Sequence, residues 1–96
     1  MNESESREEI CRVGASLYAR GYVHASAGNI SVKLDDGSFL ITPTDACLGK
    51  LMASELAHVS ADGVQLSGAR ASKTLVLHRS IYEASAQARC VIHTHA

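Results

Sequence analysis

The stretch NISVKLDDGSFLIT, residues 29–42, decides the fold because it has the pattern of a β-hairpin. Apolar and polar residues alternate over positions 30–34, which is the period of a strand with one buried face. Asp36 and Gly37 supply a tight turn, and the apolar run at 39–41 begins the return strand. The stretch therefore predicts two antiparallel strands.

Helices are predicted on both sides of this hairpin. Residues 4–20 form an amphipathic pattern, with Ser4 or Ser6 available as the N-cap and Gly21 suited to the position after the C-cap. A second helical pattern runs from residue 72 to about residue 86. The first helix thus precedes the hairpin, and the second follows it after an intervening segment.

Short elements fill the remaining segments. Residues 42–50 read as a loop, and residues 52–68 suggest one helical turn followed by a hairpin around Asp62 and Gly63. The apolar stretch at 90–92 is predicted to be a strand. With no internal repeat or linker, one domain of the α/β or α+β class is expected, and local pattern does not separate these two classes.

Composition excludes several kinds of partner. The 96 residues carry 9 basic and 10 acidic side chains, so charge gives no case for nucleic acid or an anionic membrane. No apolar run approaches a membrane span, and the acidic start does not resemble a signal peptide. The three cysteines have no paired spacing, which favours free thiols in a reducing cytoplasm.

The segment CVIHTHA, residues 90–96, contains a candidate metal site. In a strand, His93 and His95 would project from the same face, and two neutral imidazoles suit zinc or another borderline divalent cation. Strand histidines bonded to backbone or water are the alternative. A catalytic zinc usually takes three protein ligands. Neither His58 nor His78 has a spacing that recommends it as the third, and His78 is expected to be packed or hydrogen-bonded.

Three further segments could bind a phosphate. SAGN (26–29) offers a glycine turn with polar neighbours, and TPTDA (42–46) is a hydroxyl-bearing loop. In RASKT (70–74), Ser72 is a suitable helix N-cap and Lys73 places a cation beside the exposed N–H groups. Taken singly, each segment is equally compatible with an ordinary turn or a capped helix.

Taken in order, these motifs resemble the class II aldolase/adducin family. The resemblance covers RGYVHASAGNISVKLDDGSFLITPTDACLGKL (20–51) and LSGARASKTLVLHRSIYEASAQARCVIHTHA (66–96). It implies an α/β fold with three α/β/α layers and a mainly antiparallel sheet, assembled as a homotetramer with active sites at subunit interfaces. It also implies one zinc ion per subunit, bound by His93 and His95. The residues that it implies for binding a substrate phosphate are Gly28, Asn29, Thr44, Asp45, Ser72 and Lys73.

One position departs from the pattern of the family's aldolases. Thr74 stands where they carry a glutamate that acts as acid and base, and a threonine hydroxyl cannot serve as a general base near neutral pH. Loss of carbon dioxide from a β-keto acid reaches the same enediolate without a base. The segments TPTDACLGKL and SKTLVLHRSIY also look most like those of the family's 3-oxo-tetronate 4-phosphate decarboxylases.

The resemblance therefore favours a zinc-dependent lyase that converts a phosphorylated four-carbon sugar acid, such as 3-oxo-tetronate 4-phosphate, to dihydroxyacetone phosphate and carbon dioxide. A sugar-phosphate aldolase such as fuculose-phosphate aldolase, or an epimerase, is the first alternative. A non-catalytic module like the adducin head domain, which shares the fold, is the second.

Length is the other departure, because family members continue past the His-x-His and supply the third zinc histidine there. Residues 1–96 are accordingly expected to be the N-terminal part of a single class II aldolase-like domain. Alone, they are expected to be catalytically inactive, since two histidines do not complete a catalytic zinc site. They are also expected to be poorly stable, because the last strand would expose an edge and apolar residues such as Val91 and Ile92.

Overall fold

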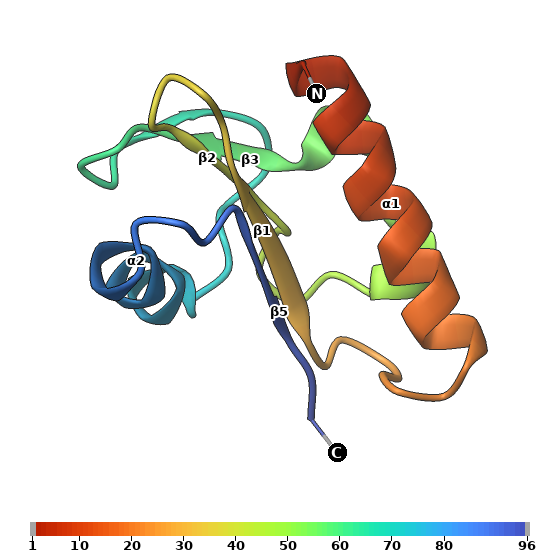
Figure 1. The fold of residues 1–96 in the computed structure, drawn as a ribbon. Helices are drawn as coiled ribbons and strands as arrows, with labels where there is room; N and C mark the ends of the chain where they lie inside the picture. Colours follow the sequence, from red (N-terminus) through yellow and green to blue (C-terminus); the bar gives the residue numbers. More distant parts are fainter. Residues whose placement is uncertain (1, 96) are drawn as a thin grey trace.

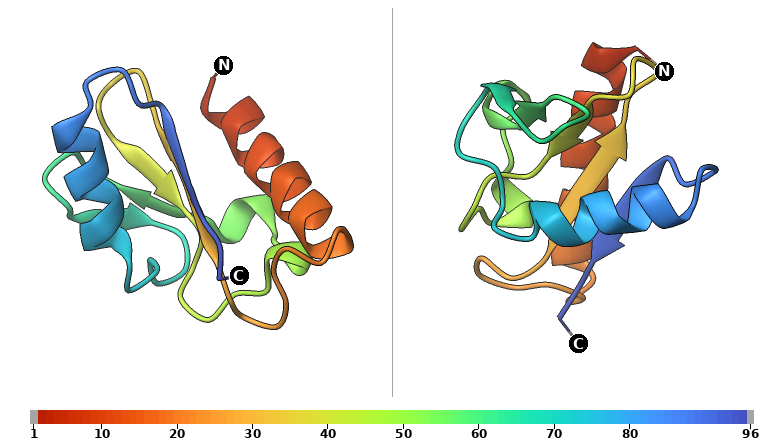
Figure 2. Two further views of the ribbon diagram at one scale, coloured as in Figure 1. Left: turned by 60° about the horizontal axis from the view of Figure 1, so that its bottom comes forward. Right: turned by 90° about the vertical axis from the view of Figure 1, so that its left-hand side faces the viewer.

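An antiparallel sheet forms the middle layer of the molecule, and one long helix lies on each of its faces (Figures 1 and 2). The computed structural model describes residues 2–95. Within them the sheet has five strands in the order β4-β3-β2-β1-β5. The strands are β1 (Asn29–Lys33), β2 (Phe39–Ile41), β3 (Ala57–Val59), β4 (Gln65–Ser67) and β5 (Cys90–His93). This confirms the three-layer α/β/α arrangement, and every strand pairing is antiparallel.

The two predicted hairpins are both present. In the first, Val32 of β1 faces Leu40 of β2, and Gly37 in the connecting turn has a φ of +88°. The second joins β3 to β4, and the short 3-10 helix η2 (Ala53–Glu55) precedes it as expected. A further 3-10 helix, η1 (Leu48–Lys50), lies in the segment that was predicted to be a loop.

The helix α1 (Glu3–Ala19) begins one residue earlier than predicted. Its cap is Asn2, whose side chain accepts a hydrogen bond from the Glu5 N–H while the Glu5 carboxylate accepts one from the Asn2 N–H. The expectation that a serine caps this helix was wrong, because this reciprocal pair already satisfies its first turn. The predicted end is confirmed, since Gly21 has a φ of +76° and donates its N–H to the Tyr18 carbonyl.

The helix α2 (Leu75–Ala84) begins three residues later than predicted. The Ser72 hydroxyl accepts a hydrogen bond from the Thr74 N–H at 3.2 Å, and the Leu75 N–H binds the Ser72 carbonyl at 3.1 Å. This turn occupies the backbone that was expected to be helical. Ser72 is therefore not the N-cap. Thr74 holds that position, and its side chain makes no capping hydrogen bond.

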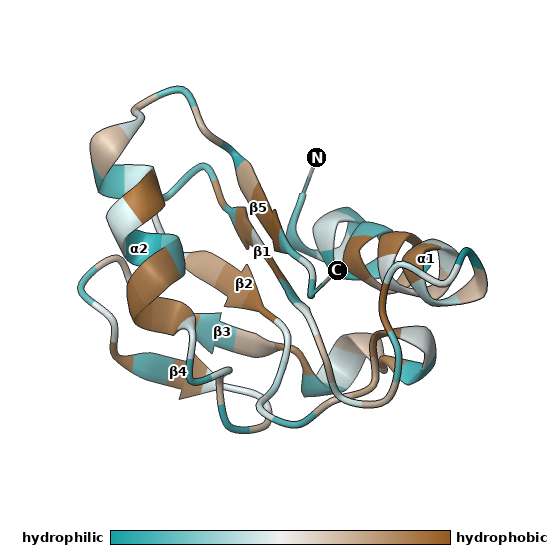
Figure 3. Cartoon of the chain, turned by 90° about the horizontal axis from the view of Figure 1, so that it is seen from below, coloured by the Kyte–Doolittle hydropathy of each residue, from teal (hydrophilic) through white to brown (hydrophobic). Residues whose placement is uncertain are grey.

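The two faces of β1 bury different kinds of side chain. Ile30 and Val32 pack towards α1 in an apolar cluster, together with Ile10, Val23, Leu40, Leu48 and Leu56. Ser31, between them, points the other way and contacts two side chains of α2. Figure 3 shows the apolar segments of β1, β2 and β5, in brown, between the two helices. The polar face of β1 is thus covered by α2.

The described residues contain no helix that is long and apolar enough to cross a membrane. Cys11 and Cys47 are half-buried, Cys90 is exposed, and all three cysteines are free thiols, as the sequence led us to expect. The cytoplasmic location inferred from them stays a prediction.

A close approach at Gly14 sets the distance between α1 and η1. A Cβ atom at this position would lie 2.5 Å from the carbonyl oxygen of Leu48, which is backbone and cannot turn aside. Gly14 is buried, whereas its neighbour Ala15 is exposed. The glycine is therefore needed for packing, although it costs helix propensity.

We predict that Gly14→Ala destabilises the complete protein by roughly 1–3 kcal/mol, the usual cost of overpacking, even though alanine is the better helix former. Ala15→Gly is the matched control, and it should lose only about 1 kcal/mol through propensity. Thermal unfolding of both variants measures this. A melting temperature raised by Gly14→Ala would show that the contact with η1 is not limiting.

Candidate metal and phosphate site

His93 and His95 lie side by side at the end of β5. β5 pairs with β1, so that His93 is opposite Asn29, and the strand ends at His93. His95 follows two residues later, yet the two ring centroids are only 4.9 Å apart, with the ring planes tilted by 58°. The expectation that both imidazoles project together is confirmed, although only His93 is within the strand.

A hydrogen-bonded set of buried side chains holds the His93 ring. The Asn29 amide nitrogen Nδ2 lies 3.2 Å from His93 Nδ1, and the Asn29 oxygen Oδ1 accepts a hydrogen bond from His78 Nε2. His78 Nδ1 in turn lies 2.6 Å from the Ser31 hydroxyl. His78 is thus fully buried and hydrogen-bonded at both ring nitrogens, which confirms the expectation that it is packed or hydrogen-bonded.

His58 belongs to a different part of the sheet. It lies on β3, which is separated from β5 by two strands, and its Nε2 is 2.9 Å from the Ser38 hydroxyl. Its Nδ1 is 3.9 Å from the Glu3 carboxylate. His58 is therefore not placed to act as a third ligand beside His93 and His95.

The chemistry of the pair fits two ligands of a borderline divalent cation. Two adjacent imidazoles are typical of zinc sites, and Asn29 holds one of them in place through the nitrogen that faces the protein. Across residues 2–95, however, no group of three His, Cys, Asp or Glu side chains could hold a metal ion. Among the described residues, His93 and His95 are therefore the candidate metal ligands.

Backbone hydrogen bonds bring the three predicted phosphate segments together. The Ser72 N–H binds the Thr42 carbonyl at 3.1 Å, and the Thr44 N–H binds the Arg70 carbonyl at 2.8 Å. Thr42 also pairs with Ile30, next to Asn29, through both its N–H and its hydroxyl. Segments 42–46 and 70–74 thus lie side by side, next to the start of β1 and hence near His93.

Some groups in these segments are already engaged. The Asn29 amide binds two imidazoles, and the Thr44 N–H is used by Arg70. Gly28 has a φ of +88°, and a Cβ there would lie 2.9 Å from Val23 Cγ1 and 3.1 Å from the His93 carbonyl oxygen. Gly28 is therefore required by the packing of the loop against β5, whatever it binds.

Other groups remain available for an anion. Lys73 is exposed, and the half-buried Ser72 and Thr74 hydroxyls lie 2.8 Å apart. Asp45, in the neighbouring turn, has a φ of +59°. A phosphate would meet the ammonium of Lys73 and these hydroxyls, which are groups that bind it well, whereas the carboxylate of Asp45 would repel it. Binding by these residues stays a prediction.

Burial keeps the two α2 side chains of the site uncharged. It lowers the pKa of His78 to about 4, an effect to which the nearby His93 adds. Burial also raises the pKa of Tyr82 to about 12, while the hydrogen bond with Ser31 opposes that shift. Near neutral pH the imidazole of His78 is therefore neutral, with one donor and one acceptor nitrogen.

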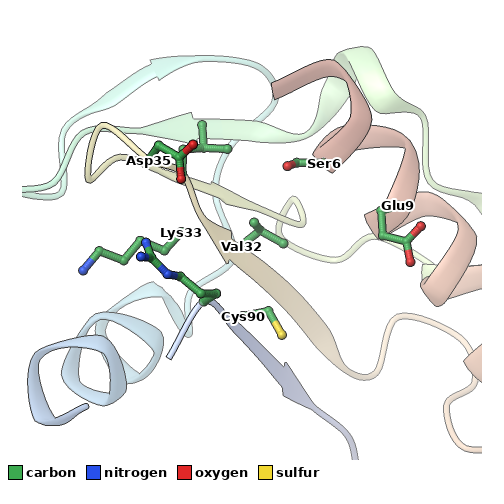
Figure 4. Close-up of a pocket in the computed structure, with 8 residues that line it drawn as sticks. Ser6, Glu9, Val32, Lys33, Asp35 and Cys90 are labelled. Atoms are coloured by element: carbon green, nitrogen blue, oxygen red, sulfur yellow. The ribbon is translucent and has the colours of Figure 1, made fainter. Parts of the chain in front are cut away.

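A cleft of about 380 Å³ lies at the other end of β5, away from His93. Figure 4 shows Ser6 and Glu9 of α1 on one side of it, and Val32, Lys33 and Asp35 of the β1–β2 hairpin with Cys90 of β5 on the other. Its position shows that this hollow is not where the histidines and the phosphate segments meet.

Sequence reasoning missed the roles of Ser31 and Tyr82. Ser31 is fully buried and hydrogen-bonded to both His78 and Tyr82. A signal existed, because His78 and Tyr82 are four residues apart and thus share a helix face, and Ser31 occupies the polar phase of a strand. The missing step was to place the second helix over the polar face of this strand.

The family described as the class II aldolase and adducin N-terminal domain matches residues 8–96. The chain therefore belongs to the class II aldolase/adducin family, as the resemblance of its motifs indicated. It is similar to a 3-oxo-tetronate 4-phosphate decarboxylase of Cupriavidus necator, with 60% identity over 94 residues that cover 98% of this chain and 43% of the relative.

Solved structures confirm the fold. YgbL from Klebsiella pneumoniae superimposes with a TM-score of 0.96 at 44% identity, over 100% of this chain and 46% of that one. An L-fuculose 1-phosphate aldolase superimposes with a TM-score of 0.90 at 22% identity, covering 100% of this chain and 46% of the other, which shows a shared fold. The chain thus spans less than half the length of the relatives that it matches.

We predict that His78 makes the metal-free protein sensitive to mild acid. Its pKa is about 4 in the folded state and 6.5 ordinarily, so between these values only the unfolded chain takes up the proton. The free energy of unfolding should fall as pH drops through 6.5 and level off below about 4, by up to roughly 3 kcal/mol.

Urea unfolding of the metal-free protein between pH 7 and pH 4 measures this contribution. The His78→Gln variant cannot take up the proton, so its stability should vary less over the same range. Equal slopes for the two proteins would mean that His78 does not carry the effect.

Proposed function

We propose that the complete protein carrying this chain is a zinc-dependent lyase. It would decarboxylate a phosphorylated four-carbon sugar acid such as 3-oxo-tetronate 4-phosphate, giving dihydroxyacetone phosphate and carbon dioxide. The observation that carries the proposal is the 60% identity to a decarboxylase of that name across nearly the whole chain. The adjacency of His93 and His95 beside the three phosphate segments supports it.

In this proposal, one set of described residues binds the substrate phosphate and another binds the metal ion. Lys73 and the hydroxyls of Thr44 and Ser72, with the backbone at Gly28 and Asn29 and at Asp45, would hold the phosphate. His93 and His95 would bind the metal ion. When bound, zinc supplies Lewis-acid stabilisation of the negative charge that develops as the carbon–carbon bond breaks.

The reaction needs no base for its first step. The bond to the carboxylate breaks, its electron pair moves towards the neighbouring carbonyl, and carbon dioxide leaves. Thr74 fits this chemistry, because its hydroxyl is hydrogen-bonded to Ser72 and cannot act as a general base near neutral pH. The carbon that loses the carboxylate must then gain a proton, and none of the described residues is assigned to donate it.

The first alternative is a sugar-phosphate aldolase or epimerase of the same family. The shared fold with L-fuculose 1-phosphate aldolase is compatible with it. Thr74 argues against it, since both reactions must remove a proton from carbon or oxygen. A non-catalytic adducin-like module is the second alternative, and the side-by-side imidazoles of His93 and His95 argue against that one. A homotetramer in the cytoplasm would suit the proposed enzyme.

We predict that the complete protein binds about one zinc ion per subunit and releases carbon dioxide from 3-oxo-tetronate 4-phosphate only when zinc is present. His95→Ala should lose most of the zinc and of the activity because a ligand is removed. His58→Gln is the control, since it removes an imidazole from β3 and should keep both.

Elemental analysis and an assay of carbon dioxide release measure the two quantities. Zinc binding without metal-dependent release of carbon dioxide would reject the decarboxylase, and a protein free of zinc with no lyase activity would favour the non-catalytic module.

We predict a different response to Thr74→Glu for each enzyme hypothesis. In a decarboxylase the new carboxylate has no proton to remove, so the rate of carbon dioxide release should not rise. In an aldolase it would restore the general base, for which an increase of about 100-fold or more in retro-aldol cleavage is expected. Thr74→Gln, which has similar size but no basic group, is the matched control. A strong gain in cleavage by the glutamate variant alone would favour the aldolase.

A further inference from the structure

Five side chains form a continuous line of hydrogen bonds from the inside of α2 to His93. Tyr82 Oη lies 2.8 Å from Ser31 Oγ, and Ser31 Oγ lies 2.6 Å from His78 Nδ1. His78 Nε2 meets Asn29 Oδ1, and Asn29 Nδ2 lies 3.2 Å from His93 Nδ1. Four of the five are buried, and His93 at the end is half-buried. We call this line the relay.

The relay has a single direction. His78 is neutral, because burial holds its pKa near 4, so it has one N–H donor and one bare nitrogen. Its Nε2–H donates to the Asn29 carbonyl oxygen, so its Nδ1 must accept from the Ser31 hydroxyl. Ser31 has then used its proton and accepts from Tyr82. At the other end, Asn29 donates from Nδ2 to His93 Nδ1.

This direction determines the tautomer of His93. With Nδ1 accepting from Asn29, the ring proton of neutral His93 is on Nε2. A metal ion binds an imidazole nitrogen that carries no proton. Nδ1 is occupied by Asn29, so Nε2 is the nitrogen left for a metal, and it must first lose its proton to become a ligand.

The alternative tautomer requires the whole relay to reverse. His93 would carry its proton on Nδ1 and donate to an acceptor, which Asn29 provides if its amide turns by half a turn and presents Oδ1. Asn29 Nδ2 would then donate to His78 Nε2, and His78 Nδ1–H would donate to Ser31. Apart from the exchange of Oδ1 and Nδ2 in Asn29, heavy atoms need not move, because an amide and an imidazole have nearly the same shape in both states.

We infer that His78 is a positioning residue, which through Asn29 sets the tautomer of His93, and that the relay reverses when His93 binds a metal ion. The inference rests on the proposed function in taking His93 as a ligand. It explains why a neutral histidine is buried here between a serine and an amide. Both of those neighbours can donate and accept, so His78 and Asn29 keep their hydrogen bonds to each other, to Ser31 and to His93 in either direction.

The direct test is nitrogen-15 NMR of the histidine rings in the complete protein, before and after zinc is added. Without zinc, His78 and His93 should both carry the proton on Nε2. With zinc, the proton of His78 should move to Nδ1, although His78 does not touch the metal. Zinc binding with the His78 tautomer unchanged would overturn the inference and leave the proposed function intact. Failure of the native protein to bind zinc would overturn both.

A variant tests the same relay through metal affinity. Ser31→Ala removes the acceptor that His78 Nδ1–H needs in the reversed state, so zinc affinity should fall by roughly 10–100-fold, the usual effect of losing an outer-shell partner. Ser38→Ala is the matched control, because Ser38 is also buried and bonded to an imidazole, that of His58 on β3. It should change zinc affinity less than about 3-fold.

Equal losses of zinc affinity in the two serine variants would show a general effect of removing a buried hydroxyl, and would overturn the inference. The NMR measurement on the native protein decides the matter even if Ser31→Ala folds poorly.

Discussion

Burial of β1 on both faces is the constraint on which the other features depend. Its apolar side chains pack against α1, whereas Asn29 and Ser31 face α2 and are almost completely buried. A buried polar group without a hydrogen-bond partner costs free energy. The side chains of α2 that face β1 must therefore include hydrogen-bond partners for Asn29 and Ser31. His78 and Tyr82 supply them, and within the described part of the chain no buried side-chain nitrogen or oxygen lacks a hydrogen bond. The hydrogen bonds that satisfy the buried polar face of β1 are thus the same ones that hold the candidate site.

Local pattern predicted the elements well but not the layering. The hairpin at 29–42, the end of α1 at Gly21 and the strand before His93 all follow from spacing and turn chemistry, which act over a few residues. Alternation in β1 shows only that its two faces differ. It cannot show whether the polar face meets water or a second helix, and here it meets α2. The late start of α2 was missed because the Ser72 hydroxyl can close a turn as readily as it can cap a helix.

The site was predictable in its parts and unpredictable in its connections. Adjacency of His93 and His95 was predicted from the alternation of a strand, although β5 ends at His93, and the three segments were assigned to a phosphate through the family resemblance. Their meeting depends on backbone pairing between segments that are distant in the sequence, such as Ser72 with Thr42, which no local signal encodes. The same holds for Asn29, which was assigned to a phosphate from its motif, while its side chain is engaged by two imidazoles. Only the three-dimensional structure reveals that competition.

The pairing of β5 with β1 also has a consequence for the order of folding. The contact between Asn29 and His93 joins residues 64 positions apart, whereas the β1–β2 hairpin closes over a few residues. Contacts between distant residues form slowly, because the entropy of a long loop is lost before the contact gives any stability. We therefore expect the hairpins and α1 to assemble early and β5 to dock late. The two histidines would then reach their places only after the hairpins and α1 have formed.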